Sequence, residues 1–374
     1  MSLTLRRVET RRDLKAFVRF PIDLYRGNPN YVPSFVFDDL KTLDRSKNPA
    51  FEFSEAEYFL AEREGRIVGR VAAIINRRYA EKWGRKYARF GWMDFIEDFE
   101  VAAALLGAVE AWARERGMEG VHGPLGFTDL DREGLLVEGF DEPATLATNY
   151  NHPYYGEYIE RLGYAKDIDW FEYRITVPSE IPAKIARVNE LLMKRTGVRL
   201  YPWRKSSEIV SKFGREFFAL IDEAYAGLYG TTPLSERQVE VYIDQYLGFI
   251  DPRFTKLLVD AAGRFVGFGL AMPSLSKALT ASRGRLLPFG WLRILLALRR
   301  PEVLDLYLVA VRKEYQSRGV VAILLAAFNQ SALDAGVKVA ESNLELETNV
   351  QVQQMWKAMD RRQHKRVRAY LKRL

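Results

Sequence analysis

The fold of this chain is decided by a stretch that occurs twice. Residues 58–72 place Gly65-Arg66-Ile67-Val68-Gly69 between two runs rich in apolar residues, and residues 257–271 place Gly263-Arg264-Phe265-Val266-Gly267 in the same setting. A turn between two such runs predicts an antiparallel hairpin. Because one hairpin lies in each half of the 374-residue chain, the sequence predicts an internal duplication.

The elements around each hairpin also repeat. A further strand is expected over 89–95 and over 303–311, each followed by a helix, over 101–116 and 320–335. Each helix ends at a glycine, as helix termini with a left-handed cap do, and leads into another strand. A helical stretch precedes each hairpin. The predicted fold class is α/β with a mixed sheet: two tandem domains, each a mixed β-sheet flanked by helices.

Domain boundaries are predicted from composition. Pro178 and Pro182 precede a helical stretch over 183–196. We therefore expect an N-terminal domain at residues 1–177, a linker helix at 178–200 and a C-terminal domain at 201–374. The second copy also carries a longer link, residues 273–301, where the first copy has only residues 76–88.

The amino-acid composition excludes several classes of function. The chain has no cysteine, which excludes a thiol nucleophile, disulfides and cysteine-ligated metals. Its longest apolar stretch, residues 286–298, is interrupted by Arg293 and is shorter than the roughly 20 residues that span a bilayer. The N-terminus has no signal-peptide pattern, so a cytoplasmic location is expected. A net charge of +7 favours anionic partners: nucleic acid, an anionic lipid surface or a phosphorylated cofactor.

A glycine-containing loop follows the strand predicted over 303–311. Free backbone N–H groups at a helix N-terminus carry partial positive charge and can hold a pyrophosphate. The loop resembles the signature Gln/Arg-x-x-Gly-x-Gly/Ala of the GNAT superfamily of N-acetyltransferases. Gln316 and Gly319 match, but Val321 stands where the family usually has Gly or Ala. The valine either crowds the pyrophosphate or points inward while its N–H still donates.

The first copy has Glu97-Asp98-Phe99-Glu100-Val101 at the equivalent place. This segment has no glycine, and its three carboxylates would repel a phosphate. We expect no coenzyme A binding there.

Nearly the whole chain resembles a widespread group of bacterial tandem-GNAT proteins, some with names that suggest lipid biosynthesis. The likeness lies in residues 21–25 with 28–33, 123–129 with 134–141, 284–290, and 345–349 with 362–366. It implies direct acyl transfer from acetyl-coenzyme A or a longer acyl-coenzyme A to an amine, without a covalent intermediate. It also implies that the thioester lies against residues 308–311, where a strand N–H polarises the carbonyl.

The residues predicted to bind the cofactor are Val309, Val311, Gln316, Ser317, Arg318, Gly319, Val320, Val321, Ala322 and Asn349. Asn349 has a second interpretation, as the cap of the last helix. Related enzymes often use a tyrosine of that helix as the acid, whereas this chain has Trp356 there and then only Tyr370.

The catalytic candidates lie on two strands. Asp305 and Tyr307 share a face of one strand by period-two alternation, and Glu345 and Glu347 do so on the next. Asp305, Tyr307 and Glu347 are the predicted catalytic residues. Each carboxylate has an alternative interpretation, as a solvated strand end or as the partner of an arginine.

A loop region of the first copy is predicted to receive the acceptor amine, because acids attract an ammonium group and loops that mix acids with aromatics are typical of binding sites. Its candidate residues are Asp129, Asp131, Glu133, Tyr150, Tyr154 and Tyr155. The alternative is a solvated acidic loop with aromatic packing. The acid spacing does not fit an EF-hand and the three histidines are scattered, so no metal is predicted.

Two segments are strongly basic. Residues 283–300 contain five arginines and no acid among leucines and a tryptophan, which is typical of a membrane-surface helix. The alternative is a packed helix whose arginines surround the cofactor phosphates. Residues 361–368 could contact nucleic acid, the cofactor phosphates or an anionic headgroup, and the alternation over 368–372 favours a strand.

The function favoured by these features is an acyl-CoA-dependent N-acyltransferase with a small-molecule or lipid amine as acceptor. It would act in the cytoplasm or at the inner face of the membrane. A catalytically inactive acyl-CoA or lipid-binding protein is the second hypothesis. Nucleic-acid binding is the third and least favoured.

Overall fold

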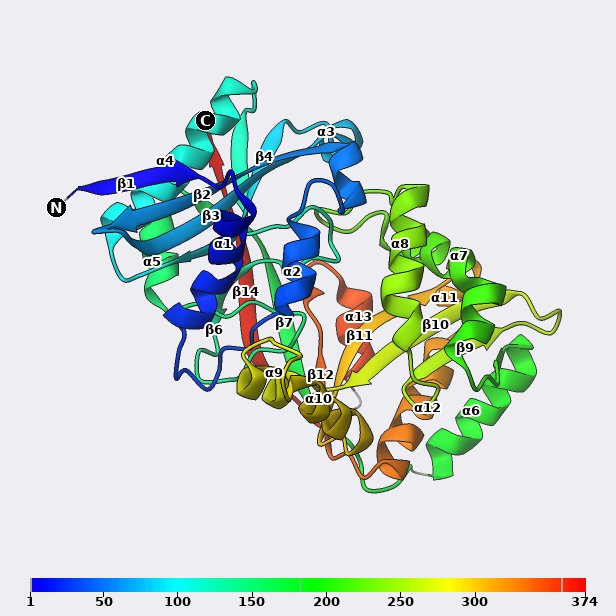
Figure 1. The fold of residues 1–374 in the computed structure, drawn as a ribbon. Helices are drawn as coiled ribbons and strands as arrows, with labels where there is room; N and C mark the ends of the chain where they lie inside the picture. The colour runs from blue at the N-terminus through cyan, green and yellow to red at the C-terminus, as the bar shows by residue number, and fades with distance from the viewer. Residues whose placement is uncertain (1, 182, 358) are drawn as a thin grey trace.

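The fold is mixed α/β with helices flanking the sheet, as the sequence predicts, but the strands of the two halves join into one continuous sheet (Figure 1). The computed structural model describes residues 2–181, 183–357 and 359–374. Along the sheet the strands follow the order β1-β2-β3-β4-β5-β14-β7-β12-β11-β10-β9-β8. Within the described residues, none of the helices is long and apolar enough to cross a membrane.

The first half of the chain forms β1 (Leu3–Arg7), α1 (Arg11–Leu24), α2 (Val36–Thr42), β2 (Ser54–Arg63), β3 (Arg66–Asn76), α3 (Arg77–Trp83), β4 (Tyr87–Phe95), α4 (Phe99–Glu115), β5 (Gly120–Gly123), β6 (Leu135–Glu138), α5 (Tyr154–Arg161) and β7 (Ala165–Thr176). The second half forms α6 (Ala183–Thr196), β8 (Arg199–Leu200), α7 (Ser206–Tyr225), α8 (Glu236–Tyr246), β9 (Thr255–Val259), β10 (Phe265–Pro273), α9 (Ser276–Ser282), α10 (Gly290–Arg299), β11 (Val303–Val311), α11 (Lys313–Gln316), α12 (Val321–Asp334), β12 (Val339–Ser342), β13 (Glu345–Leu346), α13 (Val350–Met355) and β14 (Arg361–Arg373).

The repeated hairpins are β2–β3 and β9–β10, and the strands and helices predicted after them are β4 with α4 and β11 with α12. Successive side chains of a strand point to opposite faces of the sheet, and helices cover both faces of the inner strand β3. In β3, Val71 packs in the cluster that contains Leu105 of α4, whereas Ile74 packs in the cluster that contains Phe17 of α1. The long link over 273–301 contains α9 and α10.

The two halves exchange their last strands. The C-terminal strand β14 pairs with β5 of the first half, and β7 of the first half pairs with β12 of the second. β7 and β14 also pair with each other, from Arg361 opposite Ile175 to Leu371 opposite Ala165, which makes the sheet continuous. The predicted domain boundaries stay a prediction, but this pairing places residues 361–373 beside the first half. The strand predicted over 368–372 is part of β14.

In each half, two parallel strands separate partway along. β4 pairs with β5 only from Tyr87 to Arg89, and β11 pairs with β12 only from Val303 to Leu306, although both β4 and β11 continue further. Near this point β4 and β11 are themselves bulged in their pairing with the strand on the other side, β3 and β10 respectively. Two gaps with free strand edges result, one in each half.

Candidate active site

The gap of the second half lies beside a helix N-terminus whose N–H groups are free. Gly319, Val320 and Val321 have backbone N–H groups with no hydrogen-bond acceptor among the described residues. Gly319 is exposed and adopts a φ of +78°, a left-handed conformation that glycine takes without strain. Free N–H groups at a helix start form an anion-binding site.

The residues around Gly319 support the loop. Val321 is partly buried and packs against the apolar cluster that contains Val320 and Ile323, so its side chain points inward. The Gln316 amide donates to the carbonyl of Val311 at 3.0 Å. Ser317, Arg318 and Ala322, the remaining predicted cofactor residues of the loop, are exposed.

The equivalent helix N-terminus in the first half is occupied by its own side chains. The Asp98 carboxylate caps α4 and accepts from the N–H of Glu100 at 2.9 Å. Arg63 pairs with both Asp98 and Glu100. A phosphate at this turn would therefore meet the Asp98 and Glu100 carboxylates, whereas Gly319 offers free N–H groups without a neighbouring capping acid.

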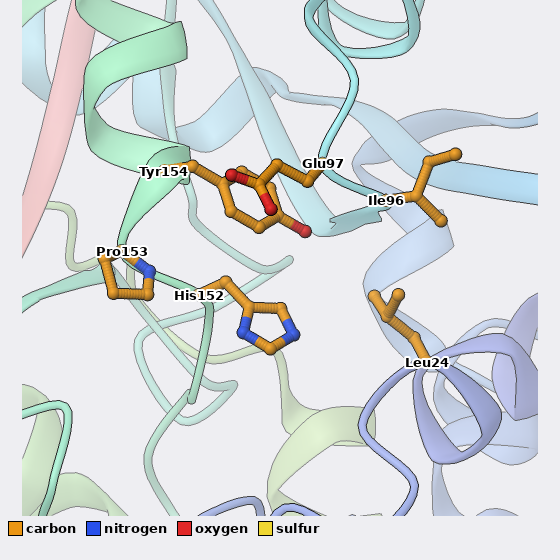
Figure 2. Close-up of a pocket in the computed structure, with 6 residues that line it drawn as sticks. All are labelled: Leu24, Ile96, Glu97, His152, Pro153 and Tyr154. Carbon is orange, nitrogen blue, oxygen red and sulfur yellow. The ribbon is translucent and has the colours of Figure 1, made fainter.

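The gap of the first half is filled by aromatic side chains. The Tyr155 hydroxyl accepts from the N–H of Phe95 at 2.7 Å, and the two rings stack with centroids 4.0 Å apart. Tyr154 instead lines a small pocket with Glu97 and His152, and the His152 ring stacks on the Tyr154 ring (Figure 2). Tyr154 and Tyr155 thus lie at the closed gap of the first half.

A large cavity, about 970 Å³, is lined by residues from both halves. The second half contributes Leu306, Tyr307, Leu308 and Val309 of β11, Leu324, Leu325 and Phe328 of α12, and residues 342–346. The first half contributes α2 and the segments 129–135 and 146–151. The cavity therefore extends from the open gap of the second half to the acidic loop of the first.

The predicted acceptor acids lie in the wall of this cavity. Burial raises the pKa of Asp131 to about 6, although the N–H groups of Phe127 and Thr128 donate to it and act in the opposite direction. Burial also raises the pKa of Asp129 and, well above its usual range, that of Glu133. Tyr150 lines the cavity as well.

The same wall contains further acids, which the sequence did not single out. Burial raises the pKa of Asp38 to about 6, and Asp94 forms a buried ion pair with Arg70 at 2.8 Å. The lining carboxyl groups belong to Asp38, Asp39, Asp94, Asp129, Asp131, Glu133, Asp244 and Glu345, whereas its cations are Lys41, Arg70 and Arg132. This excess of acids suits a cationic ligand. Within the described residues, no cluster of three such side chains has an arrangement that could hold a metal.

Two acids of the second half line the cavity, the exposed Asp244 and the buried Glu345. Glu345 is 6% exposed, and Trp356 donates its indole N–H to one carboxylate oxygen at 2.6 Å. The other oxygen has no partner among the described residues. Burial raises the pKa of Glu345 to about 7, and the Trp356 bond partly opposes this effect. A carboxyl group that titrates near neutrality can accept a proton at physiological pH.

The three residues predicted for catalysis lie in different environments. Tyr307 lines the cavity, at the bulge between β10 and β11. Asp305 is buried outside the lining, and burial, then repulsion from Glu341, raise its pKa to about 7. Glu347 also lies outside the lining and pairs with Lys166 at 2.8 Å. The structure brings Tyr307 to the cavity but not the two acids.

The remaining candidates are placed as follows. Asn349 lines the cavity and caps α13, accepting from the N–H of Val352 at 3.4 Å. Val309 lines the cavity, whereas Val311 is buried in the core. Tyr370 is buried outside the cavity lining and bonds Glu160 at 3.1 Å.

Tyr225 is a residue of the open gap that sequence reasoning missed. Its hydroxyl lies 3.1 Å from the carbonyl oxygen and 3.3 Å from the nitrogen of Val309. Burial raises its pKa, so the phenol keeps its proton at neutral pH. The internal repeat could have identified this residue. Tyr225 lies at the end of α7, and Tyr25 lies at the equivalent place, directly after α1. The Tyr25 hydroxyl contacts the Tyr155 hydroxyl at 3.0 Å in the gap of the first half.

Comparisons with known proteins agree with this fold. The chain is 31% identical to Protein YghO of Escherichia coli (strain K12) over 373 residues, 97% of this chain and 94% of that protein. It is 29% identical to the bacterial ceramide synthase of Caulobacter vibrioides over 354 residues, 91% of this chain and 90% of that protein. A search against protein-family profiles finds no match.

Two solved structures share the fold at low sequence identity. A tandem GNAT protein from the clavulanic acid biosynthesis pathway superposes with a TM-score of 0.59 at 13% identity, covering 100% of this chain and 98% of that one. A GCN5-related N-acetyltransferase from Sphaerobacter thermophilus superposes with a TM-score of 0.54 at 14% identity, covering 99% and 95%. These structures show the architecture alone.

Proposed function

This chain belongs to the bacterial tandem-GNAT family that includes Escherichia coli protein YghO, and from that membership we propose that it is an acyl-CoA-dependent N-acyltransferase acting on a lipid amine. The observation that carries the proposal is the pairing of free N–H groups at α12 with an open gap that leads into an acidic, largely apolar cavity. Acyl transfer is the general activity of this fold, whereas the donor and acceptor are the proposed part.

The donor binds in the second half. The pyrophosphate of coenzyme A lies on the free N–H groups at Gly319, Val320 and Val321, and the rest of the donor follows β11 to Val309. Because α12 contributes Leu324 and Phe328 to the cavity wall, an acyl chain passes from the surface loop directly into apolar surroundings. A longer acyl-CoA fits this path as well as acetyl-CoA does.

The acceptor is a lipid amine held by both halves. The wall holds eight carboxyl groups against three cations, and a bound ammonium group would favour the charged form of the buried ones. The apolar residues of α7, α10 and β10 that line the same cavity suit an alkyl chain. The name of one relative, a bacterial ceramide synthase, also points to a lipid product. A small-molecule amine would leave most of the apolar wall unused.

The reaction needs a base, a carbonyl polariser and an acid. Glu345 takes a proton from the ammonium group, and the freed amine attacks the thioester carbonyl. The N–H of Val309, which donates to the Tyr225 hydroxyl at 3.3 Å, holds the developing oxyanion once the thioester takes the place of that hydroxyl. The attack forms the C–N bond, and collapse of the oxyanion then breaks the C–S bond. Tyr225 gives its proton to the leaving thiolate, and the second proton lost by the amine nitrogen restores the Tyr225 hydroxyl. Asp305 and Glu347 support the strands in this scheme, and Tyr307 lies beside the reacting groups.

The test is to measure binding and transfer with the same preparation. We expect isothermal titration to detect coenzyme A, acetyl-CoA and palmitoyl-CoA. We also expect incubation of palmitoyl-CoA with a long-chain amine to release one free thiol for each amide found by mass spectrometry. If none of the three coenzyme A ligands binds, the proposal fails. Binding without thiol release would instead identify an inactive acyl-CoA-binding protein.

A further inference from the structure

The segment around α10 leaves an unusual number of large apolar side chains in solvent. Leu287 is 76% exposed, Phe289 68% and Trp291 51%. We define the α10 surface as the exposed side chains of Leu287, Phe289, Trp291, Leu292, Leu295 and Leu296. Soluble monomers rarely leave contiguous apolar patches uncovered, and such patches mark sites of interaction with proteins, ligands or membranes.

The charge around this surface is of one sign. Five exposed arginines belong to the segment, and it contains no acid: Arg283, Arg285, Arg293, Arg299 and Arg300. None of these arginines forms an ion pair within the described residues. The next acid, Glu302, is already paired with Lys277. Five unneutralised cations would repel a second copy of the same surface but attract an anionic one.

The opposite face of α10 belongs to the cavity. Ile294 and Leu298 line it and pack on the core cluster that contains Leu275 and Leu279. The helix therefore separates the cavity from the exterior, with apolar side chains on both sides.

The cavity opens beside this surface. Three residues that line the cavity are also exposed to solvent and therefore mark its mouth: Phe37 is 54% exposed, Tyr246 43% and Leu286 38%. The neighbouring backbone is fixed in place because the N–H of Val36 donates to the carbonyl of Gly284 at 3.1 Å. α2, which carries Phe37, thus holds the start of the α10 segment beside it, and Figure 1 shows α9 and α10 next to the end of α2.

We propose that residues 283–300 dock the protein on an anionic bilayer and that the lipid acceptor enters the cavity from the bilayer through the mouth at Phe37, Tyr246 and Leu286. The leucines and aromatics insert at the acyl boundary, while the arginines contact the anionic headgroups. The entry route rests on the proposed function, whereas the docking does not.

Vesicle flotation tests the docking. We expect the full chain to float with vesicles of phosphatidylglycerol and to bind phosphatidylcholine vesicles much more weakly. Trp291→Ser with Leu295→Ser should reduce binding at least tenfold, because two inserted side chains are lost. Each of Arg293→Gln, Arg299→Gln and Arg300→Gln should reduce it about fivefold. The matched control is Val188→Ser with Leu191→Ser, which removes two exposed apolar side chains of α6 and should leave binding unchanged.

Two results would overturn the docking: no binding of the wild-type chain to phosphatidylglycerol, or equal binding of the Trp291/Leu295 variant while its melting curve is unchanged. A wild-type dimer that this variant dissociates would assign the surface to self-association and overturn it as well. Sedimentation of both proteins measures that outcome.

Transfer assays separate this inference from the proposed function. The Trp291/Leu295 variant should acylate a short water-soluble amine at the wild-type rate but should lose transfer to a lipid amine embedded in vesicles. Equal loss on both acceptors would overturn the entry route. If the wild type acylates neither acceptor yet still floats on phosphatidylglycerol, the proposed function fails and the docking stands.

Discussion

The N-termini of α4 and α12 occupy the same position in the two halves but are used in opposite ways. At α4 the Asp98 carboxylate caps the helix and pairs with Arg63, whereas at α12 Gly319 and its two successors leave their N–H groups free. The adjoining gaps differ in the same sense. A tyrosine hydroxyl meets the strand in each gap, Tyr155 at Phe95 and Tyr225 at Val309, but Tyr225 and Val309 line the large cavity, whereas Tyr155 and Phe95 do not.

This difference shows that the fold alone does not decide whether the helix N-terminus is free to bind an anion. Both halves contain the bulge, the separating strands and the helix behind them, so what differs is which side chains occupy the gap and the helix N-terminus. The first half has instead a buried Arg70–Asp94 ion pair and an acidic loop facing the cavity. We infer that the duplicated halves divide the reaction, with the donor on one side and the acceptor on the other.

The most severe test of this division is Glu345→Gln, because it removes the proposed base from the donor half. We expect kcat to fall about 1000-fold with little change in donor binding, since general base catalysis contributes roughly 10²–10⁴-fold. The wild-type rate should rise with pH through about 7, the pKa to which burial raises Glu345. The variant should lose this pH dependence.

Glu347→Gln is the matched control, because Glu347 pairs with Lys166 outside the cavity. This variant should lower kcat by less than tenfold.

The stability of the protein gives a second measurement of the Glu345 pKa. Between pH 4.5 and about 7 the folded chain holds more protons at Glu345 than the unfolded chain, so its free energy of unfolding falls as pH rises through this window. Glu345→Gln should remove that fall. Equal kcat losses in both variants would contradict the assignment of the base.

Adding one negative charge at α12 tests whether the free N–H groups there bind the pyrophosphate. Gly319→Asp places a carboxylate at α12 as the first half does at α4, and should weaken coenzyme A binding about 100-fold through repulsion of the pyrophosphate. Gly319→Asn is the control of the same shape. Both residues tolerate a left-handed φ, so only the charge separates them. Isothermal titration measures the difference, and equal weakening by Asn and Asp would place the phosphates elsewhere.

The two gaps can be compared through their tyrosines. Tyr225→Phe removes the hydroxyl at Val309 and should lower kcat about tenfold if that hydroxyl protonates the leaving thiolate. Tyr155→Phe removes the corresponding hydroxyl at Phe95 and should change the melting temperature instead of kcat. Steady-state rates and thermal melts on both variants make the comparison. If only the Tyr155 variant lost rate, the reaction would take place at the gap of the first half instead of the second.

Much of the architecture was predictable from the sequence because it is local. The hairpins at Gly65 and Gly263 and the helix behind Gly319 follow from short-range turn and periodicity signals, and the duplication made each half support the other. The exchange of β7 and β14 was not predictable in this way. Strand partners far apart in sequence are chosen by packing, which alternation alone does not encode.

The site was only partly predictable for the same reason. The acidic loop at Asp129 and the glycine loop at Gly319 carry composition signals, and the structure places the first in the cavity wall and the second beside the open gap. The distinction between Glu345 and Glu347 depends on which carboxylate finds Lys166 and which finds Trp356. Asp305 and Tyr307 were expected to share one environment, but a bulge at Tyr307 interrupts the regular pairing and only Tyr307 reaches the cavity.

The smallest expected effect comes from a variant of the first half. Asp98→Ala removes the cap of α4 and its ion pair with Arg63, and should lower the free energy of unfolding by about 1 kcal/mol, as loss of a helix cap usually does. Denaturant titration measures this change. Freeing these amides should not create a second coenzyme A site, because Tyr155 still fills the adjoining gap and Glu97 and Glu100 still repel phosphate. A stoichiometry that rises from one coenzyme A to two in this variant would show that the capping carboxylate alone had silenced the first half, and that the filled gap does not matter.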